Sequence, residues 1–133
     1  MCGITGMFDV KGRRELDRAL LKRMNDLQAH RGPDGDGEHH EPGVALGHRR
    51  LAIIDLATGQ QPLYNDDKSV VVVFNGEIYN YQALIAELQA LGYRFHTRSD
   101  TEVIVHGWEA WGERCLERFR GMFAFALWDR NKE

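Results

Sequence analysis

Two short features of the sequence could carry chemistry, and the first is at the start of the chain. Met1 is followed by Cys2, and removal of an initiator methionine is favoured before a small residue. Removal would leave one residue with both a thiol and a free α-amine, and an α-amine near neutral pH can accept the thiol proton. The pattern therefore indicates a cysteine nucleophile. The alternative is a small strand residue beside the start codon.

The second feature is the segment Phe74-Asn75-Gly76-Glu77, which follows an apolar run. A side-chain amide donor followed by a glycine with an unshielded N–H could form an oxyanion hole for acyl transfer. Asn-Gly is also the commonest dipeptide of tight turns between strands. Both interpretations stay open at this stage, because a tight turn can present such donors.

Other polar clusters match known site patterns poorly. Asp34, Asp36 and Glu38 alternate as in a calcium loop, but His39 replaces the loop glycine and Ala45 replaces the required glutamate. None of the six histidines lies at a zinc-ligand spacing. We therefore expect no metal site in this chain.

Composition narrows the class of protein. The 133 residues suit one domain, and 17 basic against 20 acidic residues give a net charge of −3, which argues against a nucleic-acid binder. Apolar runs such as residues 70–74 are too short to span a membrane. The N-terminus lacks the pattern of a secretory signal, so we expect a cytoplasmic protein whose Cys2 and Cys115 are free thiols.

Three segments show helical periodicity. In residues 14–29, apolar side chains recur every three or four positions and predict one buried stripe, made of Leu16, Leu20, Met24 and Leu27. Residues 81–91 repeat apolar residues and stop at Gly92, which suits a C-terminal glycine cap. Ser99 and Glu102 match a capping box, which predicts a third helix running toward Trp111.

The strand pattern is less regular. We predict strands at residues 4–10, 43–46, 51–55, 69–74 and 122–128, with irregular loops at 31–37 and 57–67. The first strand places Cys2 at a strand tip. Residues 70–74 are apolar on both faces, so this strand needs a packed layer above and below it. Arg49 and Arg50 must point to opposite faces of a strand, so only one of them can enter a given pocket.

Seven blocks along the chain together resemble the N-terminal class II glutamine amidotransferase domain of glutamine-hydrolysing asparagine synthetases. They are Met1-Cys2-Gly3-Ile4, Arg31-Gly32-Pro33-Asp34, Arg50-Leu51-Ala52-Ile53-Ile54-Asp55, Gln61-Pro62-Leu63-Tyr64-Asn65, Phe74-Asn75-Gly76-Glu77-Ile78-Tyr79-Asn80, Ser99-Asp100-Thr101-Glu102 and Gly121-Met122-Phe123-Ala124-Phe125-Ala126. They occur in the family's order across all 133 residues.

The resemblance implies an α+β, four-layer αββα N-terminal nucleophile hydrolase fold with two stacked antiparallel sheets. It implies that Cys2 attacks the side-chain amide of L-glutamine, forms a γ-glutamyl thioester and releases ammonia. Asn75 and Gly76 match the family's oxyanion hole. The matching substrate-binding positions are Arg50 for the α-carboxylate, Asp100 for the α-ammonium group, and Leu51, Ile53, Ile54 and Glu77 for the rest of the pocket.

The resemblance also implies a longer parent protein. In the family, further strands follow, and after them a synthetase domain that uses ATP and Mg. The Ser-Gly-Gly-x-Asp-Ser loop of that domain is absent from these 133 residues. We therefore expect a C-terminally truncated amidotransferase domain without a cofactor of its own, with ammonia passed to an activated carboxylate such as aspartate. Alternatives are an amidotransferase with another acceptor, including a sugar-phosphate or phosphoribosyl one, or a non-catalytic glutamine-binding domain. A last strand without a partner also predicts self-association or a homodimer.

Overall fold

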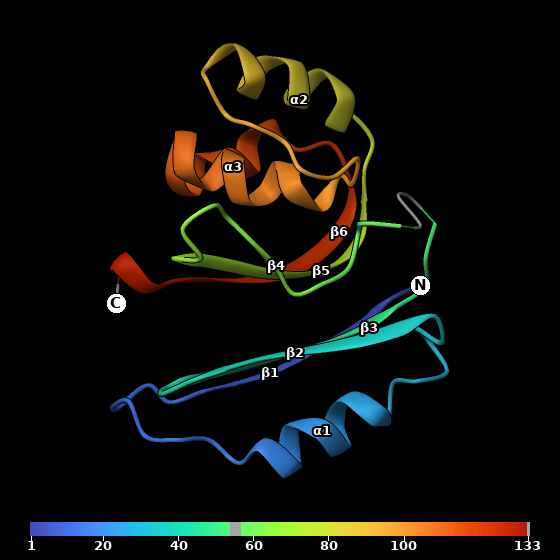
Figure 1. Cartoon of the computed structure of the whole chain (residues 1–133), viewed down its shortest axis with the longest axis vertical. Coiled ribbons are helices and arrows are strands. Elements are labelled where there is room, and N and C mark those ends of the chain that lie inside the picture. The colour runs from blue at the N-terminus through green and yellow to red at the C-terminus, as the bar shows by residue number, and fades with distance from the viewer. Residues whose placement is uncertain (54–56, 133) are drawn as a thin grey trace.

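Two three-stranded antiparallel sheets form the centre of the protein (Figure 1). The computed structural model describes residues 1–53 and 57–132. In the first sheet, the central strand is β3 (Val44–Arg50), flanked by β1 (Gly3–Phe8) and β2 (Gly35–Glu41). In the second sheet, the central strand is β5 (Val70–Ile78), flanked by β4 (Leu63–Tyr64) and β6 (Gly121–Asp129).

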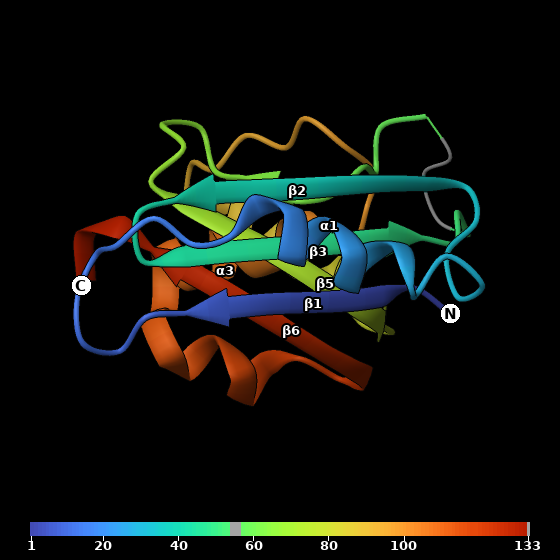
Figure 2. The ribbon, with the colours of Figure 1, turned by 90° about the horizontal axis from the view of Figure 1, so that it is seen from below.

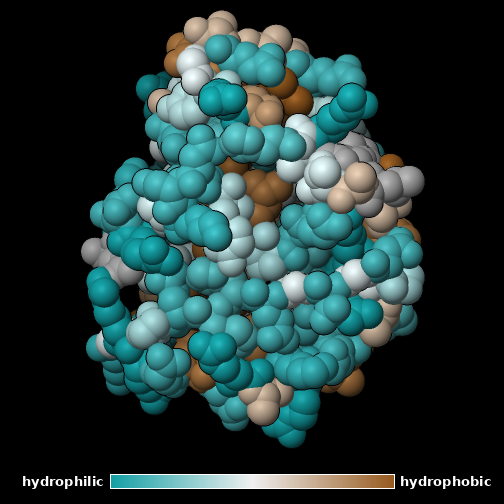
Figure 3. All heavy atoms as spheres, viewed as in Figure 1, coloured by the Kyte–Doolittle hydropathy of each residue, from teal (hydrophilic) through white to brown (hydrophobic). Residues whose placement is uncertain are grey.

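Helices cover the two outer faces of the stacked sheets. The helix α1 (Arg18–Asp26) lies across the first sheet, as Figure 2 shows from below. The helices α2 (Tyr81–Ala90) and α3 (Thr101–Trp111) cover the second sheet, and short 3-10 helices follow at Gly112–Arg118 and Arg130–Lys132. The order is helix, sheet, sheet, helix, which confirms the predicted four-layer α+β fold. Hydrophilic residues cover most of the face shown in Figure 3.

The strand β5 is the centre of both hydrophobic cores. Val72 and Phe74 pack among the residues of α2 and α3, whereas Val71 and Val73 pack against Val44 and Leu46 of β3. This alternation follows from the two-residue period of a strand. It confirms that residues 70–74 lie between two packed layers.

The helix α1 begins later than predicted and buries a different face. Asp17 caps its N-terminus, with its side chain accepting a hydrogen bond from the Leu20 N–H at 3.1 Å. Leu20 and Leu27 are exposed, so the predicted stripe is wrong at these two positions, whereas Leu16 and Met24 are partly buried. The buried Asn25 instead donates its side-chain amide to the His48 carbonyl of β3 at 3.2 Å. This polar anchor rotates the helix so that Leu21 lies inside.

Several strand boundaries also differ from the prediction. The strand β2 includes residues 35–37 of the predicted loop, because Gly35 and Gly37 pair with Arg50 and His48 of β3. Gly37 has no side chain and therefore leaves room for the backbone of another segment that lies against it. The strand β4 lies inside the second predicted loop. Residues 51–53 form no strand, since β3 already ends at Arg50, and residues 54 and 55 lie outside the described part of the chain.

The N-terminus of α3 differs from a capping box. Ser99 Oγ accepts a hydrogen bond from the Thr101 N–H at 3.0 Å, but Glu102 does not bond back to Ser99 among the described residues. The buried Glu102 carboxylate accepts from the backbone N–H groups of His96 and Thr97 and pairs with His106 Nε2 at 3.0 Å. Glu102 therefore ties the preceding loop, which ends at Asp100, to α3.

The Glu102–His106 pair makes stability depend on pH. Burial is the largest effect and opposes both charges, but the other interactions together outweigh it. Hydrogen bonds and charge interactions with Glu102 and Glu109 raise the pKa of His106, and hydrogen bonds from His106, His96 and Thr97 lower the pKa of Glu102. A raised histidine pKa contributes stability below its ordinary value of 6.5, and that stability is lost as pH rises through the raised pKa. The contribution of Glu102 is present above its ordinary value of 4.5 and is lost in acid.

We predict that His106→Gln lowers the free energy of unfolding most between about pH 4.5 and 6.5, where both members of the pair are charged. The expected loss there is about 1.5–3 kcal/mol, the size of a charge-assisted hydrogen bond. Urea denaturation across pH measures it. His96→Gln, which removes an exposed pairing with Asp66, is the control and should change little. A pH-independent difference between wild type and His106→Gln would contradict this prediction.

Candidate active site

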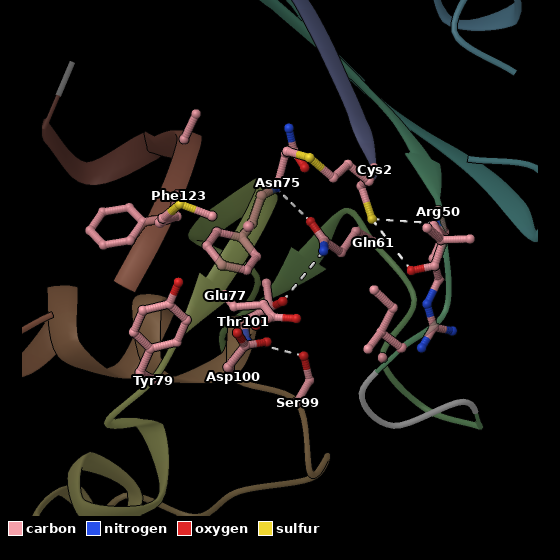
Figure 4. Close-up of a pocket in the computed structure, with 18 residues that line it drawn as sticks. Cys2, Arg50, Gln61, Asn75, Glu77, Tyr79, Ser99, Asp100, Thr101 and Phe123 are labelled. Carbon is pink, nitrogen blue, oxygen red and sulfur yellow. Dashed lines mark hydrogen bonds between the residues drawn. The ribbon is translucent and has the colours of Figure 1, made fainter. Parts of the chain in front are cut away.

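A cavity of about 410 Å³ lies next to Cys2, at the end of the sheets where β1 begins. Figure 4 shows the 18 residues that line it. The predicted site residues among them are Cys2, Arg50, Leu51, Ile53, Asn75, Gly76, Glu77 and Asp100. Ile54 lies outside the described residues. Cys2 thus shares one cavity with residues far away in the sequence. Asn75 is 73 positions from it and Asp100 is 98 positions from it.

Cys2 lies just before β1, as the strand-tip prediction required, and its side chain is partly buried. The Leu51 N–H donates to Cys2 Sγ at 3.3 Å, and the thiol lies 3.6 Å from the Leu51 carbonyl oxygen. The Arg31 Nε donates to the Cys2 carbonyl at 3.2 Å. Hydrogen bonds therefore hold both the side chain and the backbone of Cys2, and the Leu51 N–H can stabilise negative charge on the sulfur.

The loop before β2 holds the segment that carries Leu51, the hydrogen-bond partner of Cys2. The Asp34 N–H donates to the Arg50 carbonyl at 2.9 Å, and the Asp34 carboxylate accepts from the Ala52 N–H at 2.9 Å. A Cβ atom on Gly32 would collide with the backbone of Arg49, so only glycine allows this close approach. The loop thus fixes the segment that carries Leu51 next to the thiol.

Adjacent arginines at the end of β3 point in opposite directions, as predicted. Arg50 is buried and lines the cavity. Arg49 lies on the other face of the sheet and donates through Nε to the Gly32 carbonyl at 3.1 Å. Only Arg50 can therefore meet a ligand in this cavity.

Asn75 and Gly76 lie inside β5, so the tight-turn interpretation is wrong. They pair with Ala124 and Phe123 of β6 in an unbroken antiparallel register. Gly76 has φ = 147°, and a Cβ there would collide with the backbone of Met122 and Phe123. Glycine is required at this position by both its backbone angle and its close contact with β6.

The orientation of β5 directs these two residues at the cavity. Alternate side chains share a face, so Asn75 points with Val71 and Val73 toward the first sheet, at whose edge Cys2 lies. Alternate N–H groups share an edge, and the Phe74 and Ile78 N–H groups on the edge away from β6 bond to side chains of Gln61 and Asp100. The Gly76 N–H lies between them on that edge.

The cavity also contains opposite charges. Asp100 is buried and its Oδ2 accepts from the Ile78 N–H at 2.9 Å. Burial raises the pKa of Asp100, and the nearby negative charge of Glu77 raises it further. A ligand ammonium group beside Asp100 would relieve both effects. With Arg50 in the same cavity, the site suits a small zwitterion.

Sequence reasoning missed several lining residues, of which Gln61, Tyr79, Ser99, Thr101 and Phe123 are labelled in Figure 4. Gln61 is in one of the seven blocks, but its contacts arise between segments far apart in the chain. Among the described residues, no group of three histidine, cysteine or acidic side chains is placed to hold a metal ion. The helices of residues 1–53 and 57–132 include none that is long and apolar enough to cross a membrane.

Comparison with known proteins identifies the family of this chain. Residues 1–133 match the family described as glutamine amidotransferase domain. This chain belongs to that family. It is 45% identical over 133 residues to asparagine synthetase [glutamine-hydrolyzing] 1 of Bacillus subtilis, covering 98% of this chain. It is 44% identical to asparagine synthetase B of Escherichia coli, covering 100% of this chain. The resemblance found in the sequence is thereby confirmed.

The chain spans only 21% and 24% of these two relatives. A solved structure of glutamine phosphoribosylpyrophosphate amidotransferase from B. subtilis superposes with a TM-score of 0.66 over 95% of this chain and 35% of that one. Sequence identity there is 24%, so this likeness concerns the fold. It confirms the N-terminal nucleophile hydrolase fold of this amidotransferase domain.

Proposed function

We propose that this domain hydrolyses L-glutamine to glutamate and ammonia. The observation that carries the proposal is that Cys2, Asn75, Gly76, Arg50 and Asp100 line one cavity, which brings a thiol, an amide and two opposite charges together. In a glutamine molecule, the α-carboxylate would meet Arg50 and the α-ammonium group would meet Asp100. Leu51, Ile53 and Glu77 line the remaining space and Ile54 completes the substrate-binding set inferred from the sequence.

In the proposed reaction, Cys2 Sγ attacks the side-chain amide carbon of glutamine. The carbonyl oxygen becomes an oxyanion that the Asn75 amide and the Gly76 N–H stabilise. The C–N bond then breaks, nitrogen takes the thiol proton through the base, and ammonia leaves. Water adds to the γ-glutamyl thioester, releases glutamate and restores the thiol. The base is the α-amine of Cys2, which exists once Met1 is removed.

We further propose a place for this domain in a larger enzyme. The names of the relatives support an asparagine synthetase-like protein, in which the ammonia is passed to an ATP-activated carboxylate such as aspartate. ATP and Mg would bind in a synthetase domain outside residues 1–133, so no step in this cavity involves them. The free thiols of Cys2 and Cys115 support a reducing location, the cytoplasm.

Replacing the nucleophile gives the most direct test. We expect Cys2→Ala to abolish glutamine hydrolysis, because no thioester can form, and to leave glutamine binding largely intact, because Arg50 and Asp100 hold the amino-acid head. Glutamate release and isothermal titration calorimetry measure the two quantities in the full-length protein. Cys115→Ala is the control, since Cys115 is buried outside the cavity. Residual turnover above about 1% of the wild-type rate would refute the nucleophile assignment.

The two adjacent arginines provide a matched pair for substrate binding. Arg50→Lys should raise KM for glutamine by about tenfold to a hundredfold, because a point charge cannot make a two-pronged contact with a carboxylate. Arg49→Lys should change KM far less, because Arg49 bonds to Gly32 on the opposite face. Steady-state kinetics of both variants decide the assignment. Equal effects would exclude Arg50 as the carboxylate partner.

We also propose that the 133-residue chain self-associates through the edges of β1 and β6. A hollow of about 600 Å³ lies between these strands and is lined mainly by apolar residues, including Ile4, Met7, Phe8, Leu127 and Trp128. Phe8 is 56% exposed although it packs against Trp128. In the described part of the chain, β1 pairs only with β3 and β6 only with β5. Open apolar strand edges favour pairing with another chain.

We predict that the chain has a mass above its 15.3 kDa monomer mass and that this mass rises with protein concentration. Size-exclusion chromatography with light scattering measures it. Phe8→Glu should shift the equilibrium toward monomer, since it charges the exposed edge, whereas Val10→Glu, at an exposed position beyond β1, should not. A monomer at every concentration would disprove self-association.

A further inference from the structure

The strand β5 continues past the end of its neighbour β4, and a side chain takes over the role of the missing strand. In the β4–β5 register, Leu63 is opposite Val72, so the antiparallel pattern places Gln61 opposite Phe74. β4 begins only at Leu63, however. The Gln61 Oε1 accepts the Phe74 N–H at 2.6 Å in place of a backbone carbonyl.

The other end of the Gln61 carboxamide is also held. Its Nε2 donates to Thr101 Oγ1 at 3.3 Å, which connects it to the first residue of α3. The backbone of Gln61 rests on β2, because a Cβ at Gly37 would collide with the Gln61 carbonyl. Contacts with β2 and α3 therefore fix the position of Gln61. The hydrogen bond between Gln61 and the Phe74 N–H in turn fixes the position of β5.

The carbonyl group of Phe74 is held from the opposite sheet. The buried His48 of β3 places Nε2 at 3.0 Å from the Phe74 carbonyl oxygen. Burial lowers the pKa of His48 to about 4, so the ring is neutral at pH 7 and donates through Nε2. The Phe74 carbonyl and the Asn75 N–H belong to one planar peptide group. Both backbone polar groups of Phe74 thus have side-chain partners immediately before Asn75-Gly76.

We propose that Gln61 is a positioning residue of glutamine hydrolysis, which sets the oxyanion donors Asn75 and Gly76 by holding the Phe74 N–H and anchoring it to Thr101. This proposal rests on the proposed function. The Phe74 amide is buried, so loss of its acceptor leaves an unsatisfied donor and lets the segment shift. Displacement of donors by about 1 Å can cost about a hundredfold in rate. Gln61 acts on the backbone that carries the donors through its hydrogen bond to Phe74. This role requires no contact between Gln61 and the substrate.

The test compares two neighbouring glutamines in the full-length protein. Gln61→Met keeps the length of the side chain but removes the acceptor, and Gln60→Met is the matched control at an exposed position outside the cavity. We expect Gln61→Met to lower kcat for glutamine hydrolysis by about tenfold to a hundredfold with KM unchanged. We expect Gln60→Met to behave as wild type.

A second measurement separates the oxyanion donors from the rest of the pocket. In the aldehyde analogue of glutamine, CHO replaces the side-chain amide. The Cys2 sulfur bonds to the aldehyde carbon and the thiol proton is transferred to the oxygen, which occupies the oxyanion position. Gln61→Met should lower the affinity for this analogue by the same factor by which it lowers kcat. Glutamine affinity, measured by calorimetry with Cys2→Ala present in both proteins, should not change.

The outcomes are distinct. If wild type neither hydrolyses glutamine nor binds the aldehyde, the proposed function is wrong. If wild type does both and Gln61→Met matches it, or loses glutamine affinity as much as aldehyde affinity, Gln61 is not a positioning residue of the oxyanion donors. If Gln61→Met does not fold, Thr101→Val and Thr101→Ser replace it. Loss of kcat and aldehyde affinity in Thr101→Val, restored in Thr101→Ser, supports the proposal, and no difference between the two overturns it.

Discussion

The structure depends on burying β5 on both faces while giving the Phe74 and Ile78 N–H groups on its open edge side-chain partners. Burial is achieved by the valines and Phe74, which face the helices on one side and β3 on the other. The edge next to β4 is the difficulty, because β4 has only two residues. Beyond it, Gln61 and Asp100 provide the missing acceptors. An unpaired buried N–H would be costly, so these side chains are needed for the fold as well as for the site.

This constraint explains why the candidate active site lies where it does. A short neighbour strand leaves β5 uncovered at one end, and the cavity occupies that uncovered end. The Gly76 N–H is available there because no strand pairs with it on this edge among the described residues. Asp100 serves two roles, since one oxygen holds the Ile78 N–H while the carboxylate gives the cavity a negative end.

The two sides of the cavity come from different sheets, each held by its own loop. Arg31 and Asp34 fasten Cys2 and the segment after Arg50 to the first sheet. Glu102 fastens the loop before Asp100 to the second. His48 bridges the sheets through the Phe74 carbonyl. The distance between the Cys2 thiol and the Asn75-Gly76 pair is therefore set by the packing of the two sheets, which is close and resists small shifts.

The sequence by itself determined the family, the four layers and the residues expected in the site, because apolar periodicity and the seven blocks are local properties of the chain. It predicted the opposite orientation of Arg49 and Arg50 from strand geometry alone. Only the tertiary structure decided that Asn75-Gly76 is inside a strand, because the pairing with β6 overrides the turn preference of the dipeptide. The buried face of α1 and the contacts of Gln61 and Glu102 were likewise decided by polar groups from distant segments, whose hydrogen bonds leave no periodic pattern in the sequence.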